Sequence, residues 1–225
     1  MRLRIKDIRN LFIDEYKQKN FIQDKSGIKT IEILAASFIA DEPFIFGQPN
    51  ENYIQRELNW YNSMSLNIND IGETIPKMWK NIADVNGFIN SNYGWCINSS
   101  DNYNQYENCK EELIKKPFSR RATMIYNRPS MWVDYNRNGM NDFMCTYAAQ
   151  FFIRNDKLYS YVLMRSNDAW AGYRNDYAWH NHVHTKLSND LNIDKGFIYW
   201  TSGSLHLYEK QFYLIDEYLK NNHIT

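Results

Sequence analysis

The order of helix-like and strand-like segments constrains the fold of this 225-residue chain more than any other feature of its sequence. In some segments apolar residues recur at helical spacing, and in others they alternate as they do in strands. Helices are predicted over residues 5–19, 52–64, 75–83, 101–116, 175–191 and 208–220, and strands over residues 29–40, 122–126, 142–153, 159–164 and 197–200. Because helices and strands are mixed without strict alternation, we expect an α+β fold. No linker, internal repeat or low-complexity stretch interrupts the chain, so we expect a single domain over residues 1–225.

Charge, hydropathy and cysteine content argue against several classes of protein. Lys plus Arg and Asp plus Glu number 26 each, so the chain has no basic surface for nucleic acid, and a small charged substrate held by a few arginines fits better. No apolar run approaches the roughly 18 residues that a membrane span needs, so we expect a cytoplasmic protein without a membrane partner. The three cysteines, Cys96, Cys109 and Cys145, follow no CxxC or Cys/His spacing, which argues against a disulfide framework and a structural zinc.

Cys145 is the candidate nucleophile, and Arg165 is its candidate partner. Cys145 lies within the predicted strand 142–153 and Arg165 follows the predicted strand 159–164, so hairpin-like pairing would bring the two side chains together. Arginine always carries its charge and therefore favours the thiolate form of a nearby cysteine. The alternatives are that Cys145 is a small core residue and that Arg165 forms a surface salt bridge.

Several short segments carry a resemblance to a known family. They read Arg-Glu-Leu-Asn-Trp at 56–60, Tyr-Gly at 93–94, Ser-Arg-Arg at 119–121, Arg-Ser-Asn-Asp at 165–168, Gly-Tyr-Arg-Asn-Asp-Tyr-Ala at 172–178 and Gly-Ser-Leu-His-Leu-Tyr at 203–208. In order and spacing they resemble the nucleotide-binding segments of the thymidylate synthase family, from about residue 24 to residue 213. Within that family the chain is most similar to the deoxycytidylate hydroxymethylases of T-even bacteriophages, through residues 24–27, 41–47 and 128–131.

The resemblance implies a thymidylate synthase-like fold, in which helices surround a mixed β-sheet and two subunits form a homodimer sheet to sheet. It also implies a reaction without a metal, in which a cysteine thiolate adds to C6 of a pyrimidine nucleotide. C5 can then attack the one-carbon unit of the co-substrate 5,10-methylenetetrahydrofolate. Cys145 matches that nucleophile, and Arg165 and Ser166 match groups near the nucleotide phosphate. The implied location is the cytoplasm of a phage-infected bacterium.

The same resemblance assigns residues that bind the pyrimidine deoxynucleotide monophosphate. Arg120 and Arg121 match a pair that reaches across a twofold interface to the phosphate bound by the partner subunit. Lys25 stands where thymidylate synthases carry another phosphate-binding arginine on a mobile loop. His206 and Tyr208 match the pair that binds the sugar 3′-hydroxyl.

Asp176 is the residue from which we predict the base. Thymidylate synthases carry asparagine here, whose amide pairs with N3–H and O4 of uracil, whereas cytosine presents an acceptor at N3 and a donor at N4. An aspartate accepts from N4, and in its protonated form it also donates to N3. Asp176 is therefore predicted to read cytosine and to act in catalysis. The alternative is that Asp176 caps the helix predicted to begin at residue 175.

Glu57 matches the glutamate that organises water and moves protons at the base. In a hydroxymethylase water captures the methylene intermediate, so Glu57 is predicted to be the general base for that water, and a solvated helix charge is the alternative. Tyr93, in the Tyr-Gly pair, is predicted to lie at the substrate. Asp168 matches a contact to the folate pterin, and Trp79 either packs against the cofactor or is a core ring.

Departures from the thymidylate synthase pattern favour the hydroxymethylase branch. Met144 and Thr146 flank the nucleophile where thymidylate synthases have proline and histidine, and Met164 replaces a glutamine. The printed chain also lacks the apolar C-terminal tail that closes the site in those enzymes, so we expect a more open and wetter site.

The sequence also allows two rival functions and contains one further motif. The chain is predicted to be a dCMP hydroxymethylase, and the first rival is a thymidylate synthase that methylates dUMP and releases dihydrofolate. The second is a non-catalytic regulator that binds nucleotide or RNA, against which neutral charge and the set Cys145, Glu57 and Arg165 argue. His180 and His184 have HxxxH spacing, but no glutamate follows the first histidine, so we expect no metal.

Overall fold

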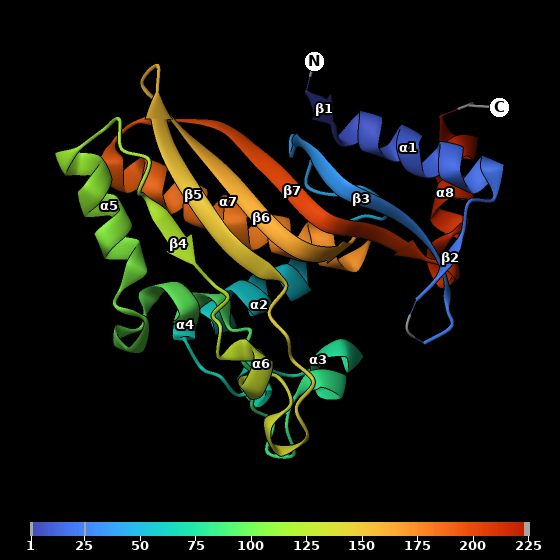
Figure 1. The fold of residues 1–225 in the computed structure, drawn as a ribbon, viewed down its shortest axis with the longest axis horizontal. Coiled ribbons are helices and arrows are strands. Elements are labelled where there is room, and N and C mark those ends of the chain that lie inside the picture. Colours follow the sequence, from blue (N-terminus) through green and yellow to red (C-terminus); the bar gives the residue numbers. More distant parts are fainter. Residues whose placement is uncertain (1, 25, 223–225) are drawn as a thin grey trace.

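A seven-stranded mixed sheet organises residues 2–24 and 26–222, which the computed structural model describes (Figure 1). The strand order is β1-β3-β7-β6-β5-β4, with β2 paired to β3. Pairing is parallel between β1 and β3 and between β6 and β7, and antiparallel elsewhere. The strands are β1 Leu3–Arg4, β2 Ile22–Gln23, β3 Lys29–Ile39, β4 Thr123–Ile125, β5 Thr146–Arg154, β6 Lys157–Asp168 and β7 Asp194–Tyr208. The predicted α+β class and mixed sheet are confirmed.

Helices cover one face of the sheet and one of its ends (Figure 1). The helices are α1 Ile5–Gln18, α2 Glu51–Ser63, α3 Lys77–Ile82, α4 Tyr93–Asn98, α5 Gln105–Lys115, α6 Met131–Asp134, α7 Ala171–Leu191 and α8 Tyr213–Asn221, with short 3₁₀ turns at Ile68–Ile71, Ser100–Asn102, Arg137–Gly139 and Glu209–Gln211. The long helix α7 connects the parallel strands β6 and β7, a connection that requires a crossover, and it runs behind β5 and β6 in Figure 1. Helices α2, α3, α4 and α6 gather at the lower end of the sheet.

Several predicted boundaries differ from the observed ones because tertiary packing extends or interrupts the elements. Strand β7 is much longer than the predicted 197–200, since it pairs along its length with both β3 and β6. The helix predicted from residue 101 begins only at Gln105, because Tyr103 and Asn104 adopt left-handed conformations with φ of 63° and 46°. Elements β1, β2, α4 and α6 were not predicted.

Two boundary differences change how the candidate site is built. Cys145 immediately precedes β5 and does not lie in the middle of a strand, and Arg165 lies within β6 and does not follow it. Helix α7 begins at Ala171, four residues before the predicted start, because buried Tyr173 already packs against the core. Asp176 therefore lies inside the helix, and the alternative role of a helix cap is wrong.

Two clusters of buried side chains meet at the candidate site. One cluster contains Trp79 and Tyr93, together with buried residues of α2, α4, α5 and α7. The other contains Tyr173 and buried residues of α1, β3, β7 and α8, and Cys145 packs against it. Polar groups placed where the clusters meet are surrounded by protein on most sides, which lowers the local dielectric and strengthens their interactions.

Candidate active site

Pairing of the strands β5 and β6 brings Cys145 and Arg165 together, as the sequence predicts. The backbone N–H of Arg165 donates to the Cys145 carbonyl at 2.9 Å. Arg165 Nη2 lies 3.5 Å from Cys145 Sγ and also donates to the Phe143 carbonyl at 2.6 Å, while Nε donates to the Met144 carbonyl at 3.0 Å. The guanidinium is thus held by the chain just before the cysteine. Nη1 forms no hydrogen bond to any residue in 2–24 or 26–222, so it is free to bind an anion.

The protonation of Cys145 differs from the expectation that Arg165 maintains a thiolate. The cysteine is partly exposed, but the surrounding protein raises the pKa of its thiol to about 11. Burial is the largest cause, and the nearby Asp176 and Asp142 also raise the pKa, whereas the charge of Arg165 lowers it. In the ligand-free protein the thiol is therefore protonated near neutral pH. Addition to a substrate requires that this proton leave, and the Arg165 charge stabilises the thiolate that remains.

Asp176 lies on the same face of helix α7 as two buried residues, because Tyr173 precedes it by three residues and His180 follows it by four. Tyr93 Oη donates to Asp176 Oδ1 at 3.1 Å, and Asn167 Nδ2 donates to Oδ2 at 2.7 Å. Thr146 Oγ1 in turn donates to Tyr93 Oη at 2.9 Å. A continuous chain of hydrogen bonds therefore joins the segment after the nucleophile to the carboxyl group of Asp176.

Burial gives Asp176 the properties of an acid at neutral pH. Burial, the largest cause, and the charge of Glu57 raise the pKa of the carboxyl group, the hydrogen bonds from Tyr93 and Asn167 lower it, and together they bring it to about 8. A carboxyl group that is largely protonated at pH 7 can donate one hydrogen bond and accept another. This is the donor and acceptor pair that the sequence predicts for reading cytosine.

Glu57 is buried because it lies on the apolar face of α2, with Ile54, Trp60 and Tyr61, and only 4% of it is exposed. The alternative of a solvated helix charge is therefore wrong. Burial raises the pKa of this carboxyl group to about 7, although hydrogen bonds from Tyr53 and Trp79 lower it. A group with this pKa exchanges protons readily near neutral pH, as general acid–base catalysis requires.

Two residues contact Glu57, of which one is a predicted site residue and the other is not. Trp79 is 4% exposed and packs edge-on against Trp60 with 5.1 Å between ring centroids, so it is a core ring. Its Nε1 also donates to Glu57 Oε1 at 3.1 Å, and a contact with the folate stays a prediction. Tyr53 was not predicted, although it precedes Glu57 by four residues and spacing in the predicted helix would have indicated their contact.

Asn167 is the second residue that the sequence reasoning missed, although it lies between the predicted Ser166 and Asp168. It is 2% exposed, and its Oδ1 is buried without a hydrogen-bond partner in the described part of the chain. The only local feature that could have identified Asn167 as a site residue is its position between the two assigned residues. Its partner Asp176 comes from another element, which the sequence alone does not place beside it.

The register of β6 and β7 brings the predicted sugar and phosphate residues to one end of the sheet. Asp168 pairs with His206, and Ser166 pairs with Ser204. The rings of His206 and Tyr208 meet edge-on with 5.0 Å between centroids. Asp168 Oδ1 accepts a hydrogen bond from the backbone of Trp170 at 3.0 Å. Lys25 lies outside the described residues.

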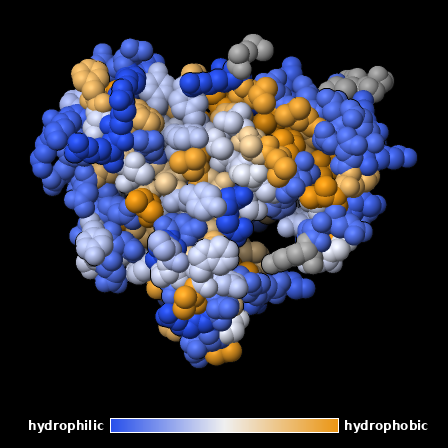
Figure 2. All heavy atoms as spheres, viewed as in Figure 1, coloured by the Kyte–Doolittle hydropathy of each residue, from blue (hydrophilic) through white to orange (hydrophobic). Residues whose placement is uncertain are grey.

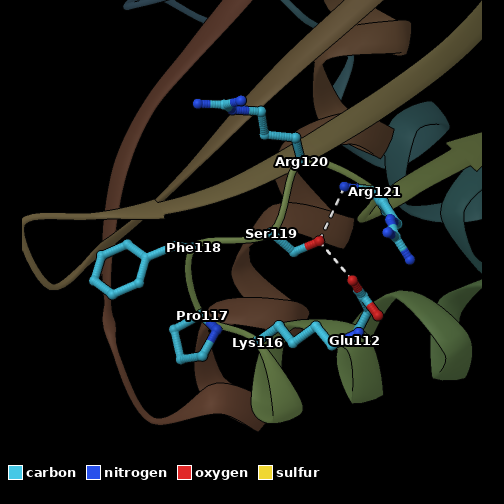
Figure 3. A pocket seen from close by; sticks show the side chains of 7 residues that line it. All are labelled: Glu112, Lys116, Pro117, Phe118, Ser119, Arg120 and Arg121. Carbon is cyan, nitrogen blue, oxygen red and sulfur yellow. Dashed lines mark hydrogen bonds between the residues drawn. The ribbon is translucent and has the colours of Figure 1, made fainter.

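Arg120 and Arg121 lie apart from this group, in the loop between α5 and β4. Both are exposed, and neither side chain forms a hydrogen bond or ion pair with another residue in 2–24 or 26–222. In Figure 3 the two side chains leave the loop in different directions. Ser119 Oγ donates to Glu112 at 2.6 Å and accepts from the Arg121 backbone at 3.1 Å, which anchors the loop to α5. Contacts within the subunit therefore leave both guanidinium groups available to bind an anion that another molecule carries.

The HxxxH histidines belong to the core. His180 is 2% exposed among the rings of Tyr126 and Trp200, and His184 is fully buried with Nε2 at 2.7 Å from the Leu158 carbonyl. The part of the chain that the structure describes contains no group of three or more His, Cys, Asp or Glu side chains arranged to hold a metal ion. Among the same residues no helix combines the length and hydropathy that crossing a membrane requires.

Comparison with known proteins gives two levels of similarity. Residues 49–225 match the family model described as thymidylate synthase. The deoxycytidylate 5-hydroxymethyltransferase of Enterobacteria phage T4 is 54% identical over 211 residues, which cover 91% of this chain and 86% of the relative. The enzyme of the same name from phage T2 is 54% identical over 209 residues, covering 90% and 85%. A thymidylate synthase of Francisella tularensis subsp. holarctica is 24% identical over 176 residues, covering 74% and 64%.

Proposed function

We propose, from the premise that this chain belongs to the thymidylate synthase family, that it is a one-carbon transferase acting on dCMP. It transfers the one-carbon unit of 5,10-methylenetetrahydrofolate to C5, and water captures the unit. The products are 5-hydroxymethyl-dCMP and tetrahydrofolate. Relatives named deoxycytidylate 5-hydroxymethyltransferase, 54% identical over most of the chain, support this proposal, and their phage origin supports action in an infected bacterium.

The hydrogen bonding of Asp176 is the observation that carries the choice of base. Its two oxygens accept from Tyr93 and Asn167, which hold the carboxyl plane in one orientation. Each oxygen keeps a second site for hydrogen bonding. With its raised pKa, Asp176 donates its proton to cytosine N3 while the other oxygen accepts from the N4 amine. An ionised Asp176 could accept from uracil N3–H but would set an acceptor against O4, and a protonated Asp176 fits uracil only if its proton moves to the oxygen that faces O4. The preference for cytosine therefore requires the proton on the oxygen that faces N3.

Cys145 and Arg165 then perform the covalent step. The Cys145 thiol gives its proton to water, and its sulfur adds to C6 of the base. Negative charge then develops toward N3, where the proton that Asp176 shares stabilises it. C5 becomes nucleophilic and accepts the one-carbon unit that the folate supplies. Arg165 stabilises the thiolate at 3.5 Å, and its free Nη1 binds the nucleotide phosphate. When the sulfur leaves C6 at the end, the aromatic base is restored.

Glu57 serves the capture of water. Loss of the C5 proton to water breaks the bond from the one-carbon unit to the folate nitrogen, which takes up a proton and leaves as tetrahydrofolate. The base then carries an exocyclic methylene group that water attacks. A carboxylate with a pKa of about 7 takes a proton from this water as its oxygen bonds to the methylene carbon. The water supplies the hydroxyl group and the folate needs to give no hydride, so the folate product is tetrahydrofolate. Asp168, at the end of β6, is proposed to contact the folate pterin.

A homodimer completes the phosphate site in this proposal. The free guanidinium groups of Arg120 and Arg121 bind the phosphate held by the partner subunit, together with the partner subunit's Arg165 and Ser166. The surface that pairs the subunits is the sheet face opposite α7, where β6 and β7 carry Tyr161, Leu163 and Phe197. Phe197 is 45% exposed, and Figure 2 shows a hydrophobic area over β3 on this face. Sheet faces with exposed apolar side chains are typical of interfaces.

Product masses test the proposed function directly. The purified protein is incubated with 5,10-methylenetetrahydrofolate and with dCMP, CMP or dUMP. We expect dCMP to gain the mass of CH₂O with formation of tetrahydrofolate, and tritium at C5 of dCMP to be released. The Cys145→Ala variant should release none. Gain of CH₂ on dUMP with stoichiometric dihydrofolate would overturn the proposal, and unchanged tritium release by Cys145→Ala would overturn the covalent step.

A further inference from the structure

The two oxygens of Glu57 have different surroundings. Oε1 accepts a hydrogen bond from Tyr53 Oη, one turn earlier on α2, and a second from Trp79 Nε1 on α3 at 3.1 Å. Trp79 Nε1 also lies 2.8 Å from Tyr53 Oη, so the three groups form a closed triangle. Oε2 accepts no hydrogen bond from any residue in 2–24 or 26–222. It is also absent from the buried polar atoms that lack partners. Oε2 therefore keeps some accessible surface, although the residue as a whole is 4% exposed.

The triangle determines which oxygen receives a proton. An indole N–H can donate but cannot accept, so Trp79 directs a donor at both Tyr53 Oη and Glu57 Oε1. The Tyr53 hydroxyl, whose oxygen already accepts from Trp79, points its own hydrogen at Oε1. A proton on Oε1 would point toward the hydrogens of both donors. At least one of these buried hydrogen bonds would then be lost, which raises the free energy of that protonated form. The proton that Glu57 gains therefore resides on Oε2.

We propose that Tyr53 is a positioning residue that holds Glu57 Oε1 as a permanent acceptor, so that Oε2 is the oxygen that takes the proton from the attacking water. The role of Glu57 as base rests on the proposed function, whereas the coupling between Tyr53 and Glu57 stands on the hydrogen bonds alone. Tyr53 itself touches neither the reacting base nor the water. Its effect passes through the orientation and the proton affinity of Glu57.

The effect of Tyr53 on Glu57 can be distinguished from the effects of the other ionisable groups nearby. Tyr53 and Tyr61 lie on the same helix, Asp176 faces it from α7, and α3 contributes Trp79, which does not titrate. Arg56 lies over the Tyr53 ring at 5.6 Å from its centroid. The side-chain hydrogen bonds of Tyr53 join it to Glu57 and Trp79, so removal of its hydroxyl breaks no hydrogen bond to Tyr61, Asp176 or Arg56.

The decisive variant is Tyr53→Phe, which keeps the ring and removes the hydroxyl. A hydrogen bond to a carboxylate favours the ionised form, so its loss should raise the proton affinity of Glu57. The matched control is Tyr103→Phe, since Tyr103 is 83% exposed and its hydroxyl has no partner in the described chain. Two measurements are made on each protein. One is the NMR titration of the Glu57 side-chain carboxyl carbon without substrate, assigned by comparison with Glu57→Gln. The other is the pH profile of kcat/KM for dCMP.

For Tyr53→Phe we expect the Glu57 carboxyl to titrate about one pH unit higher, and the acidic limb of kcat/KM to move by the same amount. On that limb activity should fall about tenfold, with a smaller loss on the plateau. Tyr103→Phe should match the parent protein in both measurements. An unmoved Glu57 titration would overturn the inference, as would a loss of activity equal at every pH. Absence of hydroxymethylation in the parent protein, with the titration still displaced in Tyr53→Phe, would overturn the proposed function and leave the Tyr53–Glu57 coupling standing.

Discussion

Replacement of Asp176 by asparagine tests the reading of the base most directly. The variant keeps the size of the side chain but removes its charge and its acidic proton. The fold should tolerate it, because Asn167 has a buried Oδ1 without a partner that can accept from the new amide once the Asn167 amide rotates. Tyr93 continues to donate to the remaining oxygen. A change in activity would therefore report on the substrate and not on unfolding.

The expected magnitude follows from the hydrogen bonds at cytosine. Loss of a hydrogen bond to a charged or acidic partner costs roughly 1.5 to 3 kcal/mol, which lowers kcat/KM for dCMP by about 10- to 100-fold. In the variant the asparagine NH₂ group can also face the cytosine N4 amine, so that two donors oppose each other. Both groups then stay unpaired in a buried place, which lowers kcat/KM further. With dUMP the same amide finds an acceptor at O4 and a donor at N3. The preference for dCMP over dUMP should therefore reverse or nearly vanish.

Tritium release from C5-labelled dCMP and dUMP, measured across pH, gives both rates in one assay. Any pH dependence near 8 that reflects the raised pKa of Asp176 should disappear in the variant. Asp156→Asn is a suitable control, because Asp156 is exposed in the β5–β6 turn with φ of 55°, a conformation that asparagine accepts. If Asp176→Asn kept the parent protein's preference for dCMP, Asp176 would not read the base and the reasoning would be refuted.

Two further predictions concern the buried glutamate and the paired arginines. Because the folded-state pKa of Glu57 is raised from 4.5 to about 7, its ionisation should cost up to about 3 kcal/mol of stability as pH rises through that window. Glu57→Gln should remove this loss, so urea unfolding at pH 9 should find the variant more stable than the parent, and an equal fall in both proteins between pH 5 and pH 9 would contradict the assignment. If Arg121 serves the partner's phosphate, Arg121→Ala and Cys145→Ala should each be impaired alone, yet refolding them together should restore about a quarter of the parent activity. No recovery in a mixture shown to contain heterodimers would refute the shared site.

Local patterns predicted the parts of the molecule that depend on neighbours in sequence. The helical spacing of Ile5, Ile8 and Phe12 predicted α1, and the alternation after Lys29 predicted β3. The placement of Cys145 and Arg165 by two successive predicted strands was enough to predict their contact. The segments around residues 119, 165, 172 and 203 predicted the family through their resemblance, in order and spacing, to its nucleotide-binding segments.

Packing between distant elements decided the rest. The length of β7 depends on β3 and β6, and the early start of α7 depends on the burial of Tyr173. The partnership of Asn167 with Asp176 joins a strand to a helix. No periodicity within one segment reports such contacts, because they arise only when the segments fold against each other.

The sequence by itself determined the residue types that make this site: a thiol, a candidate arginine partner, two carboxyl groups and an adjacent pair of arginines. Only the tertiary structure decided their protonation and orientation. Burial outweighs the charge of Arg165 at Cys145, raises the pKa values of Asp176 and Glu57, and sets two donors against one oxygen of Glu57. The physical reason is that a charge is stabilised or penalised by everything that surrounds it, and those surroundings exist only in the folded chain.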